Sequence, residues 1–262
     1  MGADAVTYST PNFSVDLSGQ TAFVTGASSG LGVRFAKVLA RCGAKVAITA
    51  RRLDRLEALA EEIRAAGGVA LPVQLDVTDA DQLVEAVAKA EAALGTVTIL
   101  VNNAGIPDAQ RAVKMSTELI DKVLDTNLRA PYILSCEVAR RLIAAKSPGR
   151  IVNISSMAAF EYGGNGAALY SISKGAVVRM TEALAVEWAS VNINVNAIAP
   201  GAFASEMMDG MLKRIGDITQ GFRRKRLGDP AQMDSTLLYL VSPSSEFVTG
   251  TCVRVDDGQS NR

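Results

Sequence analysis

The chain has 262 residues, of which 48% are hydrophobic, and its 27 basic and 27 acidic residues give a formal net charge of zero. This length suits one large α/β domain, and the balanced charge gives no support for nucleic-acid binding. The chain contains no histidine, which excludes a Ser-His-Asp triad and any histidine-based metal site, so we expect no metal.

A polar N-terminal arm, 1–16, precedes the expected domain at 17–262. The arm has no cationic region followed by an apolar core, so it does not read as a secretory signal. No run of about twenty apolar residues follows, so a membrane partner is not expected. Cys42, Cys136 and Cys252 are far apart, and each has apolar neighbours. This pattern predicts buried, reduced thiols and a cytoplasmic protein.

Short apolar strands and amphipathic helices alternate along the domain. Strands are expected at 20–25, 45–49, a segment ending at 73–75, 98–101, 150–154, 192–198 and 251–255. Helices are expected at 31–41, 82–94, 168–189 and over a long stretch, 116–145, that is interrupted near Pro131. Such alternation builds βαβ units on a parallel sheet. The predicted fold is therefore α/β: a single-domain, Rossmann-type, doubly wound sheet of seven parallel strands flanked by helices.

A glycine-rich turn follows the first predicted strand. Gly26 permits a tight turn, Gly30 a close approach by a ligand, and Gly32 close packing of the next helix. Ser28 and Ser29 add hydroxyl donors. The turn predicts a dinucleotide pyrophosphate held at a helix N-terminus. The spacing departs from the standard G-x-G-x-x-G, and the alternative is that these glycines serve only the turn.

The end of the second predicted strand indicates which nicotinamide cofactor binds. An acidic residue there would hydrogen-bond the ribose 2′-hydroxyl, but this chain has Arg51 and Arg52. A guanidinium offers a planar fork of donors that suits a phosphate. We therefore predict that NADP(H) is preferred over NAD(H). The alternative is that both arginines are solvated residues at the start of a helix.

Tyr170 and Lys174 lie four residues apart in the helix expected at 168–189, and so on one face of it. A nearby ammonium favours the phenolate and would lower the pKa of Tyr170 from its usual value of about 10. Tyr170 is therefore a candidate general acid or base, with Lys174 as its electrostatic partner. The alternative is a surface tyrosine beside a solvated lysine.

From about Leu17 to its C-terminus, the chain resembles the short-chain dehydrogenases/reductases. The motifs that carry the resemblance, in chain order, are TGASSGLG at 25–32, Asp76-Val77, NNAG at 102–105, Asn127-Leu128, Ile154-Ser155-Ser156, YSISK at 170–174 and Pro200-Gly201. The resemblance implies an oxidoreductase that moves a hydride between NADP(H) and a secondary alcohol or ketone.

The resemblance also implies a catalytic tetrad of Asn127, Ser156, Tyr170 and Lys174. Ser156 would polarise the substrate carbonyl, and Tyr170 would deliver the proton. Lys174 would also hold the nicotinamide ribose, and Asn127 would anchor a water path to it unless it is a solvent-facing asparagine. Ser156 is a better candidate than Ser155, because its distance from Tyr170 along the chain is closer to the family's spacing.

Further cofactor positions follow from the same resemblance. By resemblance, Asp76 and Val77 contact the adenine, 103–105 form the floor beneath the cofactor, and 200–201 form the turn beside the nicotinamide. Ser205 lies near a position where the family often has a threonine. With the glycine turn and the arginines, the predicted cofactor site comprises Gly26, Ser28, Ser29, Gly30, Leu31, Gly32, Arg51, Arg52, Asp76, Val77, Asn103, Ala104, Gly105, Tyr170, Lys174, Pro200, Gly201 and Ser205.

The substrate pocket is expected outside the carboxyl ends of the strands, between 157–168, where Phe160 and Tyr162 are placed to flank the ketone, and 202–226. By resemblance 202–226 is a mobile lid, whose methionines either adapt to an apolar substrate or only pack the lid helix. The basic run at 223–226 either attracts the phosphates of an acyl carrier or coenzyme A thioester or is solvated surface.

The substrate expected is a small ketone or alcohol, with a 3-oxoacyl thioester or a sugar acid as alternatives. A cofactor-sensing protein without catalysis is a remote alternative, since such a protein would lack the tyrosine or the lysine. Members of the family assemble through the long helix and the helix that carries the tyrosine. By resemblance, a homotetramer or homodimer is therefore expected.

Overall fold

Seven parallel strands lie side by side in one sheet, in the order β3-β2-β1-β4-β5-β6-β7. The structure is a computed structural model that describes residues 12–108, 110–164 and 166–260. The strands are β1 (Thr21–Thr25), β2 (Lys45–Ala50), β3 (Val69–Gln74), β4 (Ile99–Asn102), β5 (Gly149–Ile154), β6 (Ile193–Pro200) and β7 (Cys252–Val255). The predicted seven-stranded, doubly wound sheet is confirmed, with strand ends shifted by only one or two residues.

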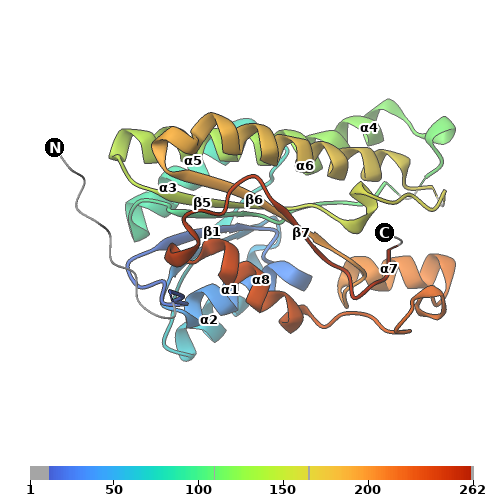
Figure 1. Cartoon of the computed structure of the whole chain (residues 1–262), viewed down its shortest axis with the longest axis horizontal. Coiled ribbons are helices and arrows are strands. Elements are labelled where there is room, and N and C mark those ends of the chain that lie inside the picture. Colours follow the sequence, from blue (N-terminus) through green and yellow to red (C-terminus); the bar gives the residue numbers. More distant parts are fainter. Residues whose placement is uncertain (1–11, 109, 165, 261–262) are drawn as a thin grey trace.

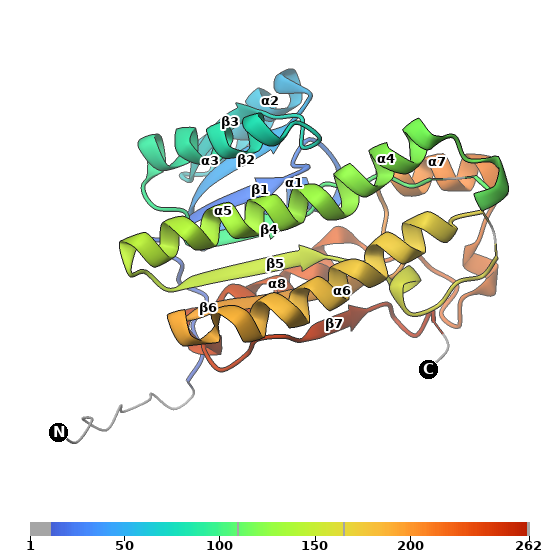
Figure 2. The ribbon, with the colours of Figure 1, turned by 90° about the horizontal axis from the view of Figure 1, so that it is seen from above.

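Helices cover both faces of this sheet (Figure 1). One layer contains α1 (Gly30–Arg41), α2 (Leu53–Ala65) and α8 (Asp234–Val241), and the other contains α3 (Ala80–Leu94), α5 (Ala130–Ala145) and α6 (Ala168–Trp188). Two more helices, α4 (Thr117–Leu124) and α7 (Glu206–Ile215), lie beyond the carboxyl ends of the strands (Figure 2). Short 3-10 turns occur at Ala112–Lys114, Met157–Ala159, Ala189–Val191, Thr219–Gly221, Pro230–Met233 and Pro243–Ser245.

Strands β1 to β6 each contribute to two hydrophobic cores, because successive side chains point to opposite faces of a sheet, whereas Val253 and Val255 of β7 pack against one of them. In β1, Val24 packs with Phe35 of α1 and Leu56 of α2, while Phe23 packs with Leu83 of α3 and helices α5 and α6 on the other face. Phe23 and Val24 are both fully buried. A parallel sheet covered on both faces needs apolar residues at consecutive positions, which is why its strands read as continuous apolar runs.

The strand order reverses between β1 and β4. From β1 the chain passes through β2 to β3 at one edge, and it then returns to β4 and continues to β7 at the other edge. Ligands of open α/β sheets bind in the crevice at such a switch point, outside the carboxyl ends of the strands. The turn after β1 and the segment after β4 meet at this crevice.

The long helical stretch is irregular where the sequence predicts an interruption, next to Pro131. A π turn, Asp125–Arg129, separates α4 from α5, and Pro131 lies in the first turn of α5. Leu124 and Ala130, on either side of the π turn, have α-helical backbone angles, so the helix continues into Pro131. The N–H that this proline lacks leaves a carbonyl oxygen of the π turn without its usual donor.

The thiols are less buried than the sequence suggests. Cys42, Cys136 and Cys252 are partly buried and unpaired, and burial raises the pKa of each thiol, that of Cys252 to about 11. Residues 1–11 of the predicted arm lie outside the described residues, and 12–16 form neither helix nor strand before the fully buried Leu17. Among the helices that the structure describes, none is both long and apolar enough to cross a membrane.

Candidate active site

The turn after β1 has the shape of an anion cradle. Gly26 and Gly30 adopt left-handed φ angles of 67° and 55°, which glycine adopts without steric cost. A Cβ on Gly26 would lie 2.9 Å from the Cα of Ala104, and one on Gly32 would lie 2.3 Å from the carbonyl oxygen of Gly26. No acidic side chain occupies the first turn of α1, and Ser29 at its N-cap makes no capping hydrogen bond. The N-terminal N–H groups of α1 therefore suit a phosphate.

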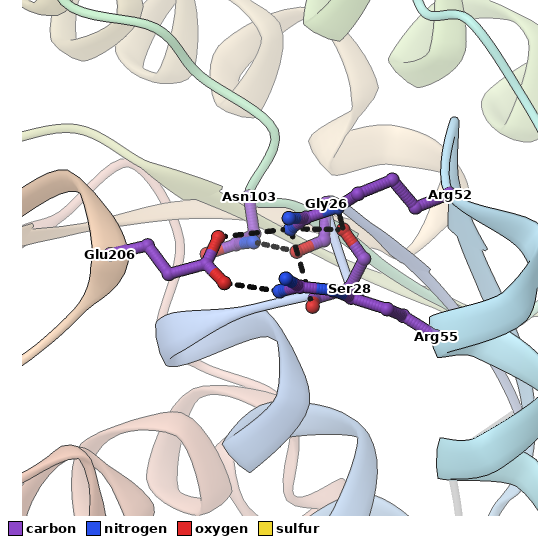
Figure 3. Close-up of polar contacts among 6 residues, drawn as sticks. All are labelled: Gly26, Ser28, Arg52, Arg55, Asn103 and Glu206. Carbon is purple, nitrogen blue, oxygen red and sulfur yellow. Dashed lines mark hydrogen bonds and ion pairs between the residues drawn. The ribbon is translucent and has the colours of Figure 1, made fainter.

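Asn103 fastens the cradle to the end of β4. Its Nδ2 donates to the carbonyl oxygen of Thr25 at 2.9 Å and to that of Gly26 at 3.2 Å (Figure 3). The backbone N–H groups of Asn103 and Ala104 both donate to Thr25 Oγ1, at 2.9 and 3.0 Å. These hydrogen bonds join the segments after β1 and β4, and the contact of Asn103 and Ala104 with a cofactor stays a prediction.

Ser205 lies against the same glycine turn. An ideal Cβ on Gly30 would lie 3.2 Å from the Cβ of Ser205, and Ser205 caps α7 by accepting a hydrogen bond from the N–H of Met208 at 3.2 Å. Gly201 has no room for a side chain, since a Cβ there would lie 2.3 Å from Gln259 Oε1. The structure thus brings Ser205 to the cradle from a distant part of the chain.

Asp76 lies directly after β3, and its carboxylate closes a local turn. Its Oδ1 accepts hydrogen bonds from the N–H and the hydroxyl of Thr78, at 3.0 and 2.8 Å. β3 is the edge strand on the β1 side of the switch point. Asp76 and Val77 therefore lie at the same end of the sheet as the cradle, and their contact with adenine stays a prediction.

Lys174 lies one helical turn after Tyr170 in α6. Its side chain is buried, and its Nζ donates to the carbonyl oxygen of Ile154 at 2.7 Å. The same Nζ lies 5.8 Å from the centre of the Tyr170 ring. Burial lowers the pKa of Lys174 from 10.5 to about 8, because the ammonium loses its hydration.

The pKa of Tyr170 is raised in the protein alone, which corrects the expectation that it is lowered. The main cause is that the partly buried phenol loses hydration, which raises its pKa. The negative charge of Asp108 raises this pKa further, and the hydrogen bond with Ser156 lowers it by less than burial raises it. The Lys174 ammonium points at the carbonyl oxygen of Ile154, and desolvation of the phenol dominates. Tyr170 is therefore a protonated phenol at neutral pH.

Ser156 and Ser155 have different environments. Ser156 hydrogen-bonds the Tyr170 side chain and accepts a hydrogen bond from the N–H of Ala158 at 3.1 Å. Ser155 is buried and donates to the carbonyl oxygen of Lys174 at 2.8 Å. The structure thus brings Ser156 to the tyrosine and uses Ser155 to hold α6.

Asn127 lies within the π turn and is 1% exposed, so the alternative of a solvent-facing asparagine is wrong. Its Oδ1 accepts from the N–H of Ile106 at 2.9 Å, and its Nδ2 donates to the carbonyl oxygen of Ile106 at 2.9 Å and to Ser173 Oγ at 3.1 Å. A Cβ on Gly105 would lie 3.3 Å from Lys174 Nζ and 3.4 Å from Asn127 Oδ1. Asn127 and Lys174 therefore both border Gly105.

Of the two predicted arginines, only Arg52 contacts the glycine turn. Its Nε and Nη2 donate to Ser28 Oγ at 3.2 and 3.0 Å (Figure 3). The Arg51 side chain is exposed and makes no hydrogen bond or ion pair with the described residues, although its carbonyl oxygen accepts from Gln74 at 3.0 Å. Arg55, one turn further along α2, lies beside Arg52 (Figure 3).

Comparisons with known proteins agree with this geometry. Residues 20–215 match the family model described as short chain dehydrogenase. The chain is 35% identical over 246 residues to gluconate 5-dehydrogenase of Gluconobacter oxydans, which covers 92% of this chain and 95% of that protein. It is 34% identical over 245 residues to a 3-oxoacyl-(acyl-carrier-protein) reductase of Rickettsia bellii, covering 93% and 98%.

A crystal structure of a short-chain type dehydrogenase/reductase from Mycobacterium marinum matches with a TM-score of 0.91 at 34% identity, covering 95% of this chain and 98% of that one. This chain is a short-chain dehydrogenase/reductase. As such it is an oxidoreductase that acts on a CH–OH or C=O group with NAD(P).

The segment 202–226 of this short-chain dehydrogenase is firmly held at its base and loosely packed beyond it. Ala204 N–H donates to the carbonyl oxygen of Gly228, and Gly228 N–H to that of Ala202, both at 2.9 Å. No side chain of α7 whose burial is described is buried, and Met207 is 44% exposed. The lid methionines therefore do not form a packed core of the helix.

The basic run of this dehydrogenase is partly neutralised by its own C-terminal segment. Arg224 Nη1 and Arg226 Nε pair with the two carboxylate oxygens of Asp257, at 3.0 and 2.7 Å. Arg223 and Arg254 line a hollow of about 530 Å³ beside this pair, and the Arg254 guanidinium lies 3.8 Å from the centre of the Phe160 ring. Phe160 follows Ser156 by one short turn, so Arg254 lies both at this hollow and beside the segment that follows β5.

Sequence reasoning missed Asp108, Arg55 and Glu206. Buried Asp108 accepts a hydrogen bond from the backbone N–H of Tyr170 at 3.0 Å and so holds the start of α6. That contact joins residues 62 positions apart, and nothing local in the sequence signals it. Arg55 could have been found, because residues three apart share a helix face and Arg52 immediately precedes α2.

Proposed function

We propose that this short-chain dehydrogenase/reductase interconverts a ketone and a secondary alcohol with NADP(H), using Tyr170 as general acid and base. The observation that carries the proposal is the cluster beside the glycine cradle, in which Tyr170 hydrogen-bonds Ser156 and lies over buried Lys174. The cradle itself supports a dinucleotide, because its glycines leave no space for any Cβ.

In the reducing direction, the hydroxyls of Ser156 and Tyr170 together donate to the carbonyl oxygen of the substrate. The nicotinamide, when bound, supplies the hydride to the carbonyl carbon or takes it back from the alcohol. Tyr170 gives its proton to the oxygen as negative charge develops there, and its raised pKa ensures that the proton is present at neutral pH.

Lys174 and Asn127 support this proton transfer. Lys174 is directed by its hydrogen bond to the carbonyl oxygen of Ile154, which leaves two ammonium protons for the nicotinamide ribose and a water. Asn127 is held rigidly through Ile106 and Ser173 and borders Gly105 opposite the lysine. These positions support the proposal of a water path that returns the proton to Tyr170.

A preference for NADP(H) is supported by the donors beside the glycine turn. Arg52 and the Ser28 hydroxyl already face each other, and Arg55 lies within reach of the same position (Figure 3). Guanidinium groups and a hydroxyl suit the 2′-phosphate of NADP(H). Arg51, which is exposed, is a secondary candidate.

Among substrates, a sugar acid is favoured by the hollow that Arg223 and Arg254 line. Arg223 and Arg254 offer guanidinium donors for a carboxylate, and gluconate is named for the relative from Gluconobacter oxydans. A 3-oxoacyl thioester, as named for the Rickettsia bellii relative, is less well supported, because Asp257 pairs with two arginines of the basic run.

A homotetramer or homodimer is supported by the outer face of α5 and α6. Tyr132 is 50% exposed and Val186 81% exposed, and a hollow of about 670 Å³ between these helices is lined by Leu128, Met180 and Leu184. Apolar patches of this kind favour association between copies. A cytoplasmic location is supported by the three unpaired thiols.

The test follows oxidation of NADPH and NADH by the wild type and by Tyr170→Phe, against keto sugar acids, 3-oxoacyl thioesters, diketones and aryl ketones. We expect turnover with NADPH and, in Tyr170→Phe, a loss of about 10²- to 10⁴-fold in kcat with unchanged NADPH affinity. Tight NADPH binding by the wild type without turnover of any substrate would instead favour a cofactor-sensing protein.

A further inference from the structure

Glu206, the first residue of α7, reaches from the lid to the two arginines at the start of α2 (Figure 3). Its Oε2 accepts from Arg52 Nη2 at 3.1 Å, and its Oε1 accepts from Arg55 Nη1. Arg52 donates in turn to Ser28 Oγ. The carboxylate therefore occupies the meeting point of two guanidinium groups, at the edge of the glycine turn.

A carboxylate and a phosphate compete for such donors, because both accept parallel hydrogen bonds from a guanidinium fork. The hydrogen bonds from Arg55 and Arg52 hold the pKa of Glu206 below its usual value, so the side chain is an anion at neutral pH. The same donors cannot be saturated by this carboxylate and a 2′-phosphate at once.

The two ion pairs also attach the lid. Among the residues that the structure describes, α7 forms ion pairs only through Glu206, with Arg52 and Arg55. No side chain of α7 whose burial is described is buried. The position of the first turn of α7 therefore depends on what the arginines bind.

We propose that Glu206 is a specificity-determining residue that occupies the 2′-phosphate position until a phosphorylated cofactor displaces it and releases the start of the lid. This inference rests on the proposed preference for NADP(H). A cofactor without the 2′-phosphate leaves both ion pairs in place. Replacement of the Glu206 carboxylate by the 2′-phosphate on Arg52 and Arg55 then determines both which cofactor binds and where the lid lies.

The size of the effect follows from the exposure of the pairs. The side chains of Arg52, Arg55 and Glu206 are 40%, 45% and 49% exposed. Exposed ion pairs are individually weak, so removing the internal competitor should tighten binding of a 2′-phosphate by about three- to tenfold.

The test measures binding of adenosine 2′,5′-bisphosphate and adenosine 5′-monophosphate by titration calorimetry, since these probes differ only in the 2′-phosphate. We expect Glu206→Gln to bind the bisphosphate about three- to tenfold more tightly than the wild type, with unchanged affinity for the monophosphate. The matched control is Asp209→Asn, because Asp209 is exposed on the same helix and forms no ion pair with any residue that the structure describes. Equal affinities for the bisphosphate in the two variants would overturn the inference, as would equal tightening for both probes.

Hydrogen exchange gives a second measurement that does not depend on affinity. In the wild type, the bisphosphate should increase exchange in the first turn of α7, and the monophosphate should not. In Glu206→Gln, exchange there should be high from the start. A first turn whose exchange does not respond to the bisphosphate would contradict displacement of Glu206.

Failure of the proposed cofactor preference has a different signature. If Arg52→Ala and the wild type bind the bisphosphate equally, and the wild type binds it no better than the monophosphate, the 2′-phosphate site itself is wrong. If the wild type prefers the bisphosphate and Arg52→Ala loses that preference while Glu206→Gln changes nothing, only the role of Glu206 is wrong.

Discussion

Burial of Lys174 should make the stability of the cofactor-free protein rise with pH. The pKa of this lysine falls from 10.5 to about 8 on folding. Between those values the unfolded chain holds a proton that the folded chain has released, so the free energy of unfolding increases with pH across this window. The difference of about 2.5 units corresponds to about 3.5 kcal/mol in all, at roughly 1.4 kcal/mol per unit. Below pH 8 the lysine is charged in both the folded and the unfolded protein, so the whole destabilisation caused by burying its charge applies there.

The measurement is urea unfolding of the wild type and of Lys174→Met at several pH values between 7 and 10.5. Tyr170 and the cysteines also titrate at alkaline pH, but both proteins contain them, so their contributions largely cancel in the difference. We expect the stability of the wild type relative to Lys174→Met to rise by about 3 kcal/mol over this range. A difference that stays constant with pH would refute desolvation of the lysine.

Two further substitutions separate catalysis from structure. Ser156→Ala should lower kcat about 10²-fold with little loss of stability, whereas Ser155→Ala should keep most of kcat but lose about 1–3 kcal/mol of unfolding free energy, because the buried carbonyl oxygen of Lys174 loses a donor. Kinetics and urea unfolding of both variants check this. If Ser155→Ala lost kcat and Ser156→Ala lost stability, the two roles would be the reverse of those proposed. Gly32→Ala should abolish cofactor binding, because its Cβ would lie 2.3 Å from the carbonyl oxygen of Gly26. Gly210→Ala, where nothing lies within 4 Å, is its control, and equal NADPH affinities in calorimetry would contradict the steric argument.

The fold could be predicted well from the sequence because the sheet is buried on both faces. Its strands are consecutive apolar residues such as Phe23 and Val24, and a helix with its own periodic pattern follows each of the strands β1 to β6. Local patterns of this kind predict the order of strands and helices along the chain. The glycine turn could also be predicted from the sequence, because the backbone constraint that requires Gly26 and Gly32 lies within one short segment.

Properties that depend on distant contacts could not be predicted. The spacing of Tyr170 and Lys174 suggests a lowered phenol pKa, but burial of the phenol by segments far away in the chain raises it. The sequence treats Arg51 and Arg52 alike, and only the path of the chain after β2 brings one of them to Ser28. Glu206 reaches Arg52 and Arg55 across 154 and 151 positions, a separation that no local pattern spans.

The π turn at Asp125–Arg129 has a consequence for how this protein can change. A π turn holds one more residue than the α-helical turn it replaces, at a cost in regular hydrogen bonding. Deleting one residue there would convert the π turn into an ordinary α-helical turn, which would leave α4 and α5 in register but change the direction of the side chains within the turn. Asn127 would then leave Ile106 and Ser173. The shorter helix would be more regular, but the candidate catalytic cluster would lack Asn127. The site therefore requires the π turn, although the turn makes the helix less regular.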